Sequence, residues 1–250
     1  MTAATTATGP GPGSPLPGPG SAAILDALSA VRDPELDEPI TSLGFVASCA
    51  VTADGDAQVR LRLPTYFCAP NFAFLMVADA YDAVAALPGV RHAEVVLADH
   101  FASDAINGGV AAHAGFAASF DGEAAGELHE LRADFLRKAV LAGTDLVCRP
   151  LVAAGTDPSR LAGLTLGDVP PSRALDRLRE RRADLGLPAG DDALLLIDPA
   201  TGEPISGEAM PIHLRRARLM RISIESNGSM CRGMLQHRYD TPGQGEEEDR

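Results

Sequence analysis

Two runs of alternating polar and apolar residues flank the turn Ala53-Asp54-Gly55-Asp56, and they constrain the fold more than any other feature of the chain. The runs cover residues 45–51 and 57–63, and a period of two is typical of strands with one buried face. Asp-Gly is a strong signal for a tight hairpin turn. The sequence therefore predicts two antiparallel strands.

Helical patterns lie on both sides of this hairpin. Residues 22–31 and 71–87 carry apolar side chains at helical spacing, and a Val-rich strand at 90–97 follows the second pattern. The order helix, strand, strand, helix, strand predicts an α/β (α+β) fold over residues 21–107. We expect a small open-faced sandwich in which two helices cover a three-stranded sheet.

The C-terminal extension, residues 108–242, is predicted to mix helices with a β-hairpin. Asn227-Gly228 is a hairpin turn signal, and Ser172 has the side chain of a helix N-cap. The expected elements are a loose helix or loop at 108–120, helices at 122–142 and 173–185, and strands at 194–197, 218–225 and 230–237.

Two polar tails enclose these regions. Residues 1–20 are rich in Pro and Gly and cannot bury enough apolar area to offset the entropy of ordering, so we expect a disordered tail. Residues 243–250 form an acidic tail that is expected to be solvated.

Composition excludes several functional classes. A net charge of −13 disfavours binding to nucleic acid or to an anionic membrane. No apolar run approaches the roughly 20 residues that span a bilayer, and no basic segment followed by an apolar stretch begins the chain. We therefore expect a cytoplasmic protein. Phosphate-binding, dinucleotide-binding and Gly-x-Ser-x-Gly motifs are also missing from the sequence.

Cys68 is the residue most suggestive of chemistry. It lies where a strand-like run stops and a helix-like run begins, and a helix N-terminus favours a thiolate over a thiol. A thiolate binds metals or attacks sulfur. The alternative is a small buried apolar residue. The four cysteines contain no Cys-x-x-Cys pair, so neighbouring thiolates form no visible closed metal site.

Two carboxylates follow the first predicted helix, in Asp33-Pro34-Glu35. In the predicted sandwich, this segment and the Cys68 loop lie at the same end of the sheet. Carboxylate oxygens of Asp33 and Glu35 close to the thiolate of Cys68 would form a mixed-ligand metal site. The alternative is a capped, solvated turn.

Together these segments resemble the SufT and PaaD-like proteins of metal-sulfur cluster assembly. The resemblance covers about residues 22–107. It runs through Asp33-Pro34-Glu35, Leu43-Gly44-Phe45-Val46, the Leu61–Leu63 run that leads to Thr65 and Cys68, Leu87-Pro88-Gly89-Val90, and the Asp99-His100-Phe101 segment with Asp104.

The resemblance implies an assembly factor whose reactive cysteine is Cys68, with Asp33, Glu35 and Thr65 in support. It also implies a link to bacterial multicomponent oxygenases, because relatives occur as their accessory proteins. The sequence departs from the family where Ser42 replaces the usual Asp, Phe67 a small residue and Ala69 a proline. These changes make the predicted site around Cys68 bulkier and less acidic than in the family.

The extension adds a basic cluster and two further cysteines. Arg215, Arg216, Arg218 and Arg221 could dock an acidic partner, or could pair with the chain's own carboxylates. Cys148 and Cys231 are expected to be structural. On a strand, Cys231 and His237 would lie roughly 20 Å apart, which is too far to bind one ion.

The leading hypothesis is a non-enzymatic accessory factor that carries an iron-sulfur cluster or iron transiently and helps to insert it into a client metalloprotein. One expected client is a component of a bacterial di-iron monooxygenase, chosen by the extension; homodimerisation is left open. One alternative is a thiol-dependent enzyme with Cys68 as nucleophile, for which His100 is a candidate base. Another is a pure interaction module in which Cys68 is structural.

Overall fold

The computed structural model describes residues 20–120 and 128–240. Apart from Gly20, the predicted tails at 1–20 and 243–250 lie outside these residues. So does the beginning of the helix predicted at 122–142.

A three-stranded mixed sheet organises the N-terminal half. Strands β1 (Val46–Val51), β2 (Asp56–Leu61) and β3 (His92–Leu97) lie in the order β1-β2-β3. β2 pairs antiparallel with β1 and parallel with β3, so that Val59 lies between Cys49 and Val95. The hairpin and the three-stranded sheet are therefore confirmed.

The hairpin turn depends on Gly55. Its φ of +87° lies in the left-handed region, which favours glycine. A Cβ at this position would lie 2.3 Å from the carbonyl oxygen of Gly89. The backbone N–H of Arg91 donates to the carbonyl of Gly55 at 2.9 Å. This close approach fixes the hairpin against the turn that begins β3.

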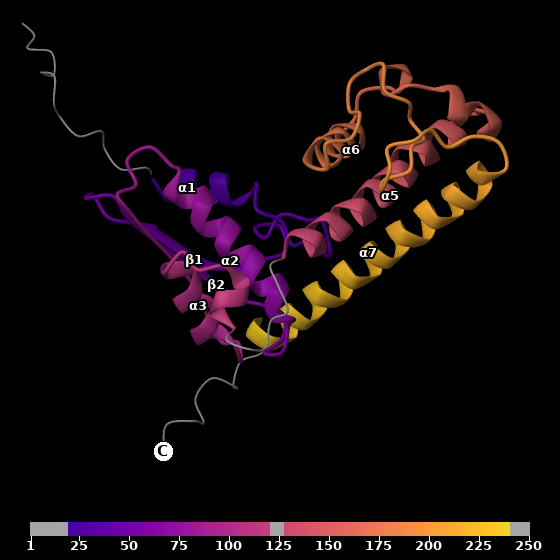
Figure 1. The fold of residues 1–250 in the computed structure, drawn as a ribbon. Coiled ribbons are helices and arrows are strands. Elements are labelled where there is room, and N and C mark those ends of the chain that lie inside the picture. Colours follow the sequence, from indigo (N-terminus) through magenta and orange to yellow (C-terminus); the bar gives the residue numbers. More distant parts are fainter. Residues whose placement is uncertain (1–19, 121–127, 241–250) are drawn as a thin grey trace, which may run out of the picture.

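Four helices accompany the sheet: α1 (Ser21–Leu28), α2 (Pro70–Ala85), α3 (Ser103–Ala111) and α4 (Phe116–Ser119). Figure 1 shows α1 and α2 beside the sheet, as the sequence predicts. α3 crosses the predicted boundary at residue 107 and adds its apolar side to the same core. Buried residues of this first core include Ile24, Leu28, Ile40, Phe45, Val59, Leu61, Val77, Val95, Leu97, Ile106 and Leu235.

The C-terminal region has a core of its own. Helix α5 (His129–Ala153) packs against α6 (Arg173–Asp184), and two short 3₁₀ helices, Pro158–Gly163 and Leu166–Asp168, connect them. The backbone N–H of Leu175 donates to Ser172 Oγ at 3.2 Å, which confirms the predicted N-cap. The second core includes Val140, Val147, Cys148, Leu161, Leu166, Leu178, Leu195 and Leu196.

The predicted hairpin around Asn227-Gly228 is wrong. A single helix, α7 (Ala209–Asp240), runs through residues 218–225, the supposed turn and residues 230–237. Residues on its inward face recur at helical spacing and pack against other elements, and this packing overrides the local turn signal. They are His213, Ala217, Ile224, Gly228, Cys231 and Leu235. Residues 194–197 also form no strand, and take part only in isolated bridges to Thr165 and Pro204.

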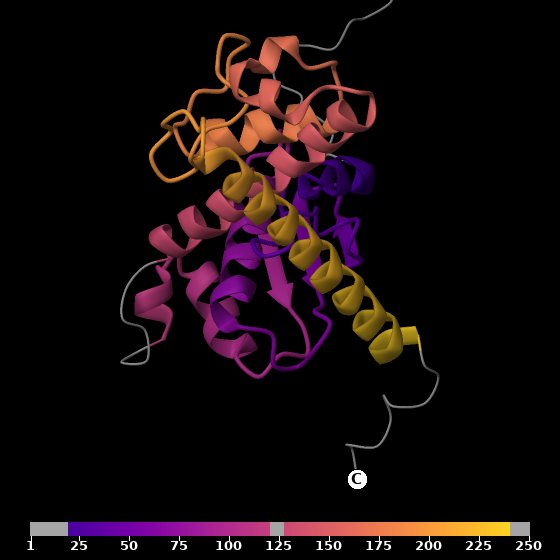
Figure 2. The same ribbon diagram turned by 90° about the vertical axis from the view of Figure 1, so that its right-hand side faces the viewer.

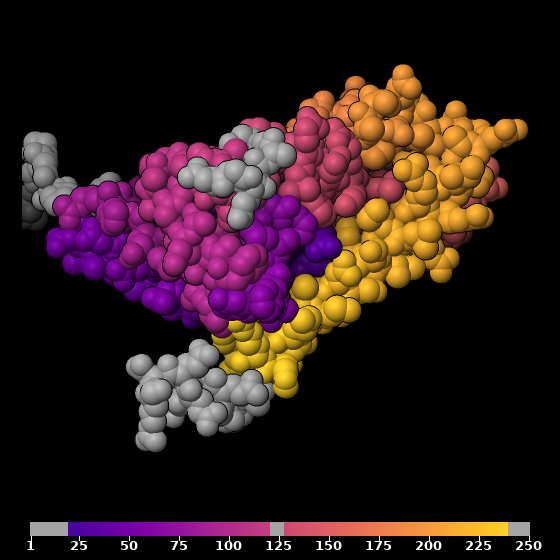
Figure 3. Space-filling view, turned by 60° about the horizontal axis from the view of Figure 1, so that its bottom comes forward, coloured from indigo at the N-terminus to yellow at the C-terminus, as the bar shows by residue number. Residues whose placement is uncertain are grey.

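Helix α7 connects the two cores. It packs along α5 and, at about 48 Å long, reaches back to the sandwich (Figures 1 and 2). Met210 and Leu214 contact the second core, whereas Cys231 and Leu235 belong to the first. The space-filling view shows the surface of α7 continuous with that of the sandwich (Figure 3). Among the described residues, no helix combines the length and apolar character that crossing a membrane requires.

Candidate functional site

Cys68 lies at the start of α2, one residue before the N-cap Ala69. The Thr65 Oγ1 and Cys68 Sγ atoms are 3.3 Å apart and share a hydrogen bond. Thr65 Oγ1 also accepts from the backbone N–H of Phe67 at 3.2 Å, which fixes the loop before the thiol. The Cys68 side chain is half-buried. The structure thus brings Cys68 and Thr65 together at a position that is not fully buried.

His100 holds the Cys68 loop through its backbone. Its Nε2 lies 2.7 Å from the Cys68 carbonyl oxygen, and its Nδ1 accepts from the backbone N–H of Ala102 at 3.2 Å. An accepting Nδ1 assigns the proton to Nε2, so the imidazole is neutral. Burial at 2% exposure lowers the pKa of His100. Both ring nitrogens are engaged with the backbone, so His100 is no base for the Cys68 thiol.

The acidic loop after α1, residues 33–38, is held by hydrogen bonds from its own backbone. Asp33 Oδ1 accepts from the N–H groups of Glu35 and Leu36 at 2.9 and 2.8 Å. Asp33 is 8% exposed. Burial raises its pKa to about 6 despite these two hydrogen bonds. Asp33 therefore exchanges a proton close to neutral pH.

Helix α7 contacts this acidic loop directly. Asn227 Nδ2 donates to Glu35 Oε1 at 3.2 Å, and Arg232 pairs with Glu38 at 2.9 Å. Cys231 lies between these two α7 residues in sequence and is half-buried. Burial, followed by the charges of Asp33, Cys68 and Glu35, raises the pKa of Cys231 to about 11. Cys231 is therefore within electrostatic reach of all three predicted metal-binding side chains.

The structure does not bring the predicted metal-binding residues Cys68, Asp33 and Glu35 together as a ligand set. Over residues 20–120 and 128–240, no three His, Cys, Asp or Glu side chains are close enough to hold a metal ion. The roles of Cys68, Asp33 and Glu35 as ligands stay predictions. The position of Cys231 near the acidic loop was not predicted from the sequence, because Cys231 was assigned to a strand of the expected hairpin and lies instead on the inward face of a helix.

Asp37 is a second residue that sequence reasoning missed. Its φ of +51° is in the left-handed region, which is uncommon outside glycine. Arg181 Nε donates to Asp37 Oδ1 at 2.7 Å, and Arg177 Nη2 lies 3.0 Å from Asp37 Oδ2. Helix α6 therefore clamps the acidic loop from one side while α7 contacts it from another.

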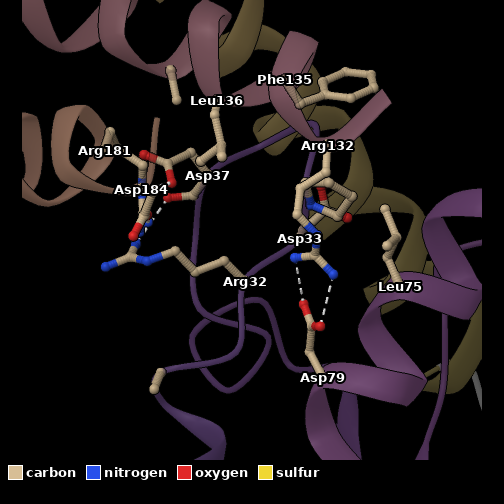
Figure 4. A pocket seen from close by; sticks show the side chains of 13 residues that line it. Arg32, Asp33, Asp37, Leu75, Asp79, Arg132, Phe135, Leu136, Arg181 and Asp184 are labelled. Atoms are coloured by element: carbon tan, nitrogen blue, oxygen red, sulfur yellow. Dashed lines mark hydrogen bonds and ion pairs between the residues drawn. The ribbon is translucent and has the colours of Figure 1, made fainter. Parts of the chain in front are cut away.

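A cavity of about 370 Å³ lies between the acidic loop, α2, α5 and α6 (Figure 4). Arg132 of α5 forms a bidentate pair with Asp79 of α2 at 2.8 and 2.7 Å. Figure 4 shows this pair at one side of the cavity and Arg181 with Asp37 at the other. Asp33 also lines it. The cavity therefore borders the acidic loop, and the Arg132–Asp79 and Arg181–Asp37 pairs each join separate regions of the chain.

The predicted basic cluster is divided by the fold. Arg221 is turned inward, where its Nε donates to Asp145 of α5 at 2.6 Å, and it also pairs with Glu225. Arg221 thus follows the second interpretation, pairing with the chain's own carboxylates. Arg215, Arg216 and Arg218 are exposed on α7. Their binding to a partner stays a prediction.

Three aromatic side chains form an exposed patch next to Cys68. Tyr66, Phe67 and Phe101 are 43%, 76% and 49% exposed. Their ring centroids lie 5.1 to 6.4 Å apart. Aromatic residues make up only 4% of the chain, so this concentration at the surface is distinctive. Exposed apolar clusters of this kind mark contact surfaces.

Residues 21–96 match the family model described as iron-sulfur cluster assembly protein. The match covers α1, the acidic loop, β1, β2, Cys68 and α2, and ends within β3, before the C-terminal region. No curated protein matches the chain. The matched domain supports a general role in iron-sulfur cluster assembly.

Proposed function

We propose that this protein is an accessory factor that carries an iron-sulfur cluster, or iron, and helps to insert it into a client metalloprotein in the cytoplasm. The observation that carries the proposal is the position of Cys68 within the matched domain. Cys68 is half-buried at the start of α2, and its sulfur lies 3.3 Å from Thr65 Oγ1. A cysteine that is not fully buried can bind iron and still be reached by the ligands of a client.

The ligand types that the sequence predicts suit such a cargo. Thiolate sulfur is the usual ligand of iron-sulfur clusters, and carboxylate oxygen binds iron ions. In the proposed site Cys68 is the main ligand, Thr65 orients it, and Asp33 and Glu35 supply negative charge. Because its pKa is about 6, Asp33 can accept or donate a proton when its surroundings change slightly.

The client is expected to dock on the aromatic patch. Phe67 is next to Cys68 in sequence, so a protein that covers the patch comes against the thiol. Exposed aromatic side chains that pack into a partner frequently dominate binding. The exposed Arg215, Arg216 and Arg218 add a basic surface for an acidic region of the client. A component of a bacterial di-iron monooxygenase is the client that the resemblance favours.

Cluster transfer to apo-ferredoxin, used as a generic recipient, tests this function. The full chain is reconstituted anaerobically with ferrous iron and sulfide, and the visible circular dichroism of holo-ferredoxin is followed. We expect Cys68→Ser to abolish transfer and the matched variant Cys49→Ser to retain it. Equal transfer by Cys68→Ser and the native protein would refute the proposed role of Cys68.

A further inference from the structure

The loops that carry Cys68 and His100 leave the sheet at the same edge. β2 and β3 are parallel neighbours, so their carboxyl ends lie side by side. Residues 62–69 follow β2 and form the Cys68 loop, and residues 98–102 follow β3 and form the His100 loop. In open α/β sheets, ligands bind outside the carboxyl ends of the strands. The two loops therefore share the edge at which a site is expected.

Two hydrogen bonds join these loops directly. His100 Nε2 lies 2.7 Å from the Cys68 carbonyl oxygen, and the backbone N–H of Phe101 donates to the Tyr66 carbonyl at 3.2 Å. Each bond connects a residue of the His100 loop to the backbone close to the thiol. The position of the Cys68 backbone thus depends on the position of the His100 loop.

Arg238, near the C-terminal end of α7, bridges the same two loops from outside. Its Nη1 donates to the Leu63 carbonyl at 3.1 Å, and its Nη2 donates to the Asp99 carbonyl at 3.0 Å. The Arg238 guanidinium also pairs with the Asp99 carboxylate. One side chain therefore holds the Cys68 loop near its start and the His100 loop at the residue before His100.

Tyr239 repeats this bridge with different chemistry. Its hydroxyl donates to Asp99 Oδ2 at 3.3 Å. The guanidinium of Arg62, the first residue of the Cys68 loop, lies 4.8 Å from the centroid of the Tyr239 ring. A cation over an aromatic face is attracted to it. Two consecutive residues of α7 therefore contact both loops.

The backbone of Asp99 needs such support. Its φ of +53° lies in the left-handed region, which is uncommon outside glycine and persists where the surroundings hold it. The Arg238 side chain is 19% exposed, and a charged group this deep requires hydrogen-bond acceptors. The contacts between Arg238 and Asp99 satisfy both needs, and they fix the residue that precedes His100.

We propose that Arg238 is a positioning residue for the Cys68 thiol. The C-terminal end of α7 clamps the Cys68 loop to the His100 loop and so keeps the thiol in one place. The proposal deepens the function given above and rests on it. The family model matches residues 21–96, so Arg238 and His100 both lie outside the match. The C-terminal region thus helps to build the thiol site of the matched domain.

The rate at which iodoacetamide alkylates each cysteine tests this clamp in the full chain. Trypsin releases Cys68 within residues 63–91 and Cys49 within residues 33–60, so mass spectrometry follows the two thiols separately. We expect Arg238→Ala to speed alkylation of Cys68 at least about threefold, because the lost hydrogen bonds no longer oppose opening of the loop. The rate at Cys49, on β1, should stay the same.

Matched variants separate the clamp from a general loss of stability. Arg232→Ala also removes an arginine near this end of α7, but Arg232 pairs with Glu38 of the acidic loop, so the rate at Cys68 should stay close to native. Asp99→Ala should speed alkylation of Cys68. Asp99→Asn should stay closer to native, because asparagine tolerates the left-handed conformation and keeps an oxygen for Arg238.

Two outcomes overturn the inference: an unchanged rate at Cys68 in Arg238→Ala, or an equal increase at Cys68 and Cys49. The transfer assay separates this failure from failure of the proposed function. If Arg238→Ala alkylates and transfers a cluster at the native rate while Cys68→Ser loses transfer, the clamp is wrong and the accessory function stands. Native transfer by Cys68→Ser refutes the accessory function, whatever the alkylation rates show.

Discussion

Arg181 of α6 donates a hydrogen bond from Nε to Asp37 Oδ1 at 2.7 Å, although 144 residues separate them. The Arg181 and Asp37 side chains are only 12% and 15% exposed. Asp37 also keeps a left-handed backbone conformation, which costs free energy unless its surroundings hold it. The C-terminal region therefore stabilises the loop that carries Asp33 and Glu35.

Replacing Arg181 should destabilise the protein. Arg181→Ala leaves the mostly buried carboxylate of Asp37 with a single arginine partner, and we expect a loss of about 2 kcal/mol. Arg137→Ala is the matched control, because Arg137 pairs with the exposed Asp134 three residues away. Its effect should stay below about 1 kcal/mol. Urea unfolding measures both, and equal effects would show that the Asp37 contact is not stabilising.

Local signals in the sequence predicted most of the N-terminal fold. Asp54-Gly55 marks the hairpin because the turn requires a positive φ at Gly55, and glycine adopts this conformation without help from distant contacts. Ser172 marks the start of α6 because its cap bonds a neighbour three residues away. Contacts of this range are encoded within a few residues, so a single sequence is enough to predict them.

The structure of the C-terminal helix α7 depends on contacts between residues that are far apart in the sequence. Asn227-Gly228 is typical of a turn, but Asn227 bonds Glu35 and Gly228 packs near Glu38, so both belong to a helix docked on the sandwich. The recurrence of Ala217, Ile224, Cys231 and Leu235 at intervals of four or seven residues was the available helical signal. Nothing in the sequence indicates which loop that face covers, so Cys231 could not be placed beside the acidic loop.

Asp33 should make stability depend on pH. Its pKa is about 6 in the folded protein, against an ordinary value of 3.8. Between these values the folded state holds more protons than the unfolded state, so stability falls as pH rises and levels off above pH 6. The total change is about 3 kcal/mol, at 1.36 kcal/mol per pKa unit.

Asp33→Asn removes this dependence and keeps an oxygen for the N–H groups of Glu35 and Leu36. We therefore expect the variant to be more stable than the native protein at pH 8, with a difference that vanishes near pH 4. Asp157→Asn is a control of opposite sign, because hydrogen bonds from Ser159 lower the pKa of Asp157. Urea unfolding at pH 4, 6 and 8 measures both. A difference for Asp33→Asn that does not change with pH would contradict the assignment.

His100 should order the loop that presents the thiol. His100→Ala removes the hydrogen bond to the Cys68 carbonyl and leaves a space where the buried imidazole was, so we expect the free energy of unfolding to fall by at least about 1 kcal/mol and amide exchange at residues 66–69 to become faster. His100→Gln should recover part of the protection, because its amide can donate to the same oxygen. His92→Ala, at an exposed position on β3, serves as the control. Equal exchange in the two alanine variants would mean that His100 does not hold the loop.

The docking of α7 can be loosened at one glycine. Gly44 has a φ of +76°, and a Cβ there would lie 3.2 Å from Leu235 Cδ2, which is closer than an ordinary contact. Gly44→Ala therefore combines backbone strain with pressure on α7. Gly155 has a φ of +98° and nothing within 4 Å of a Cβ, so Gly155→Ala carries the backbone strain alone, about 1 kcal/mol. We expect Gly44→Ala to lower the free energy of unfolding in urea more than Gly155→Ala does.

Gly44→Ala should also speed amide exchange at residues 227–238, whereas Gly155→Ala should leave exchange there unchanged. If both variants leave exchange along α7 unchanged, the contact between Gly44 and Leu235 does not hold the helix on the sandwich.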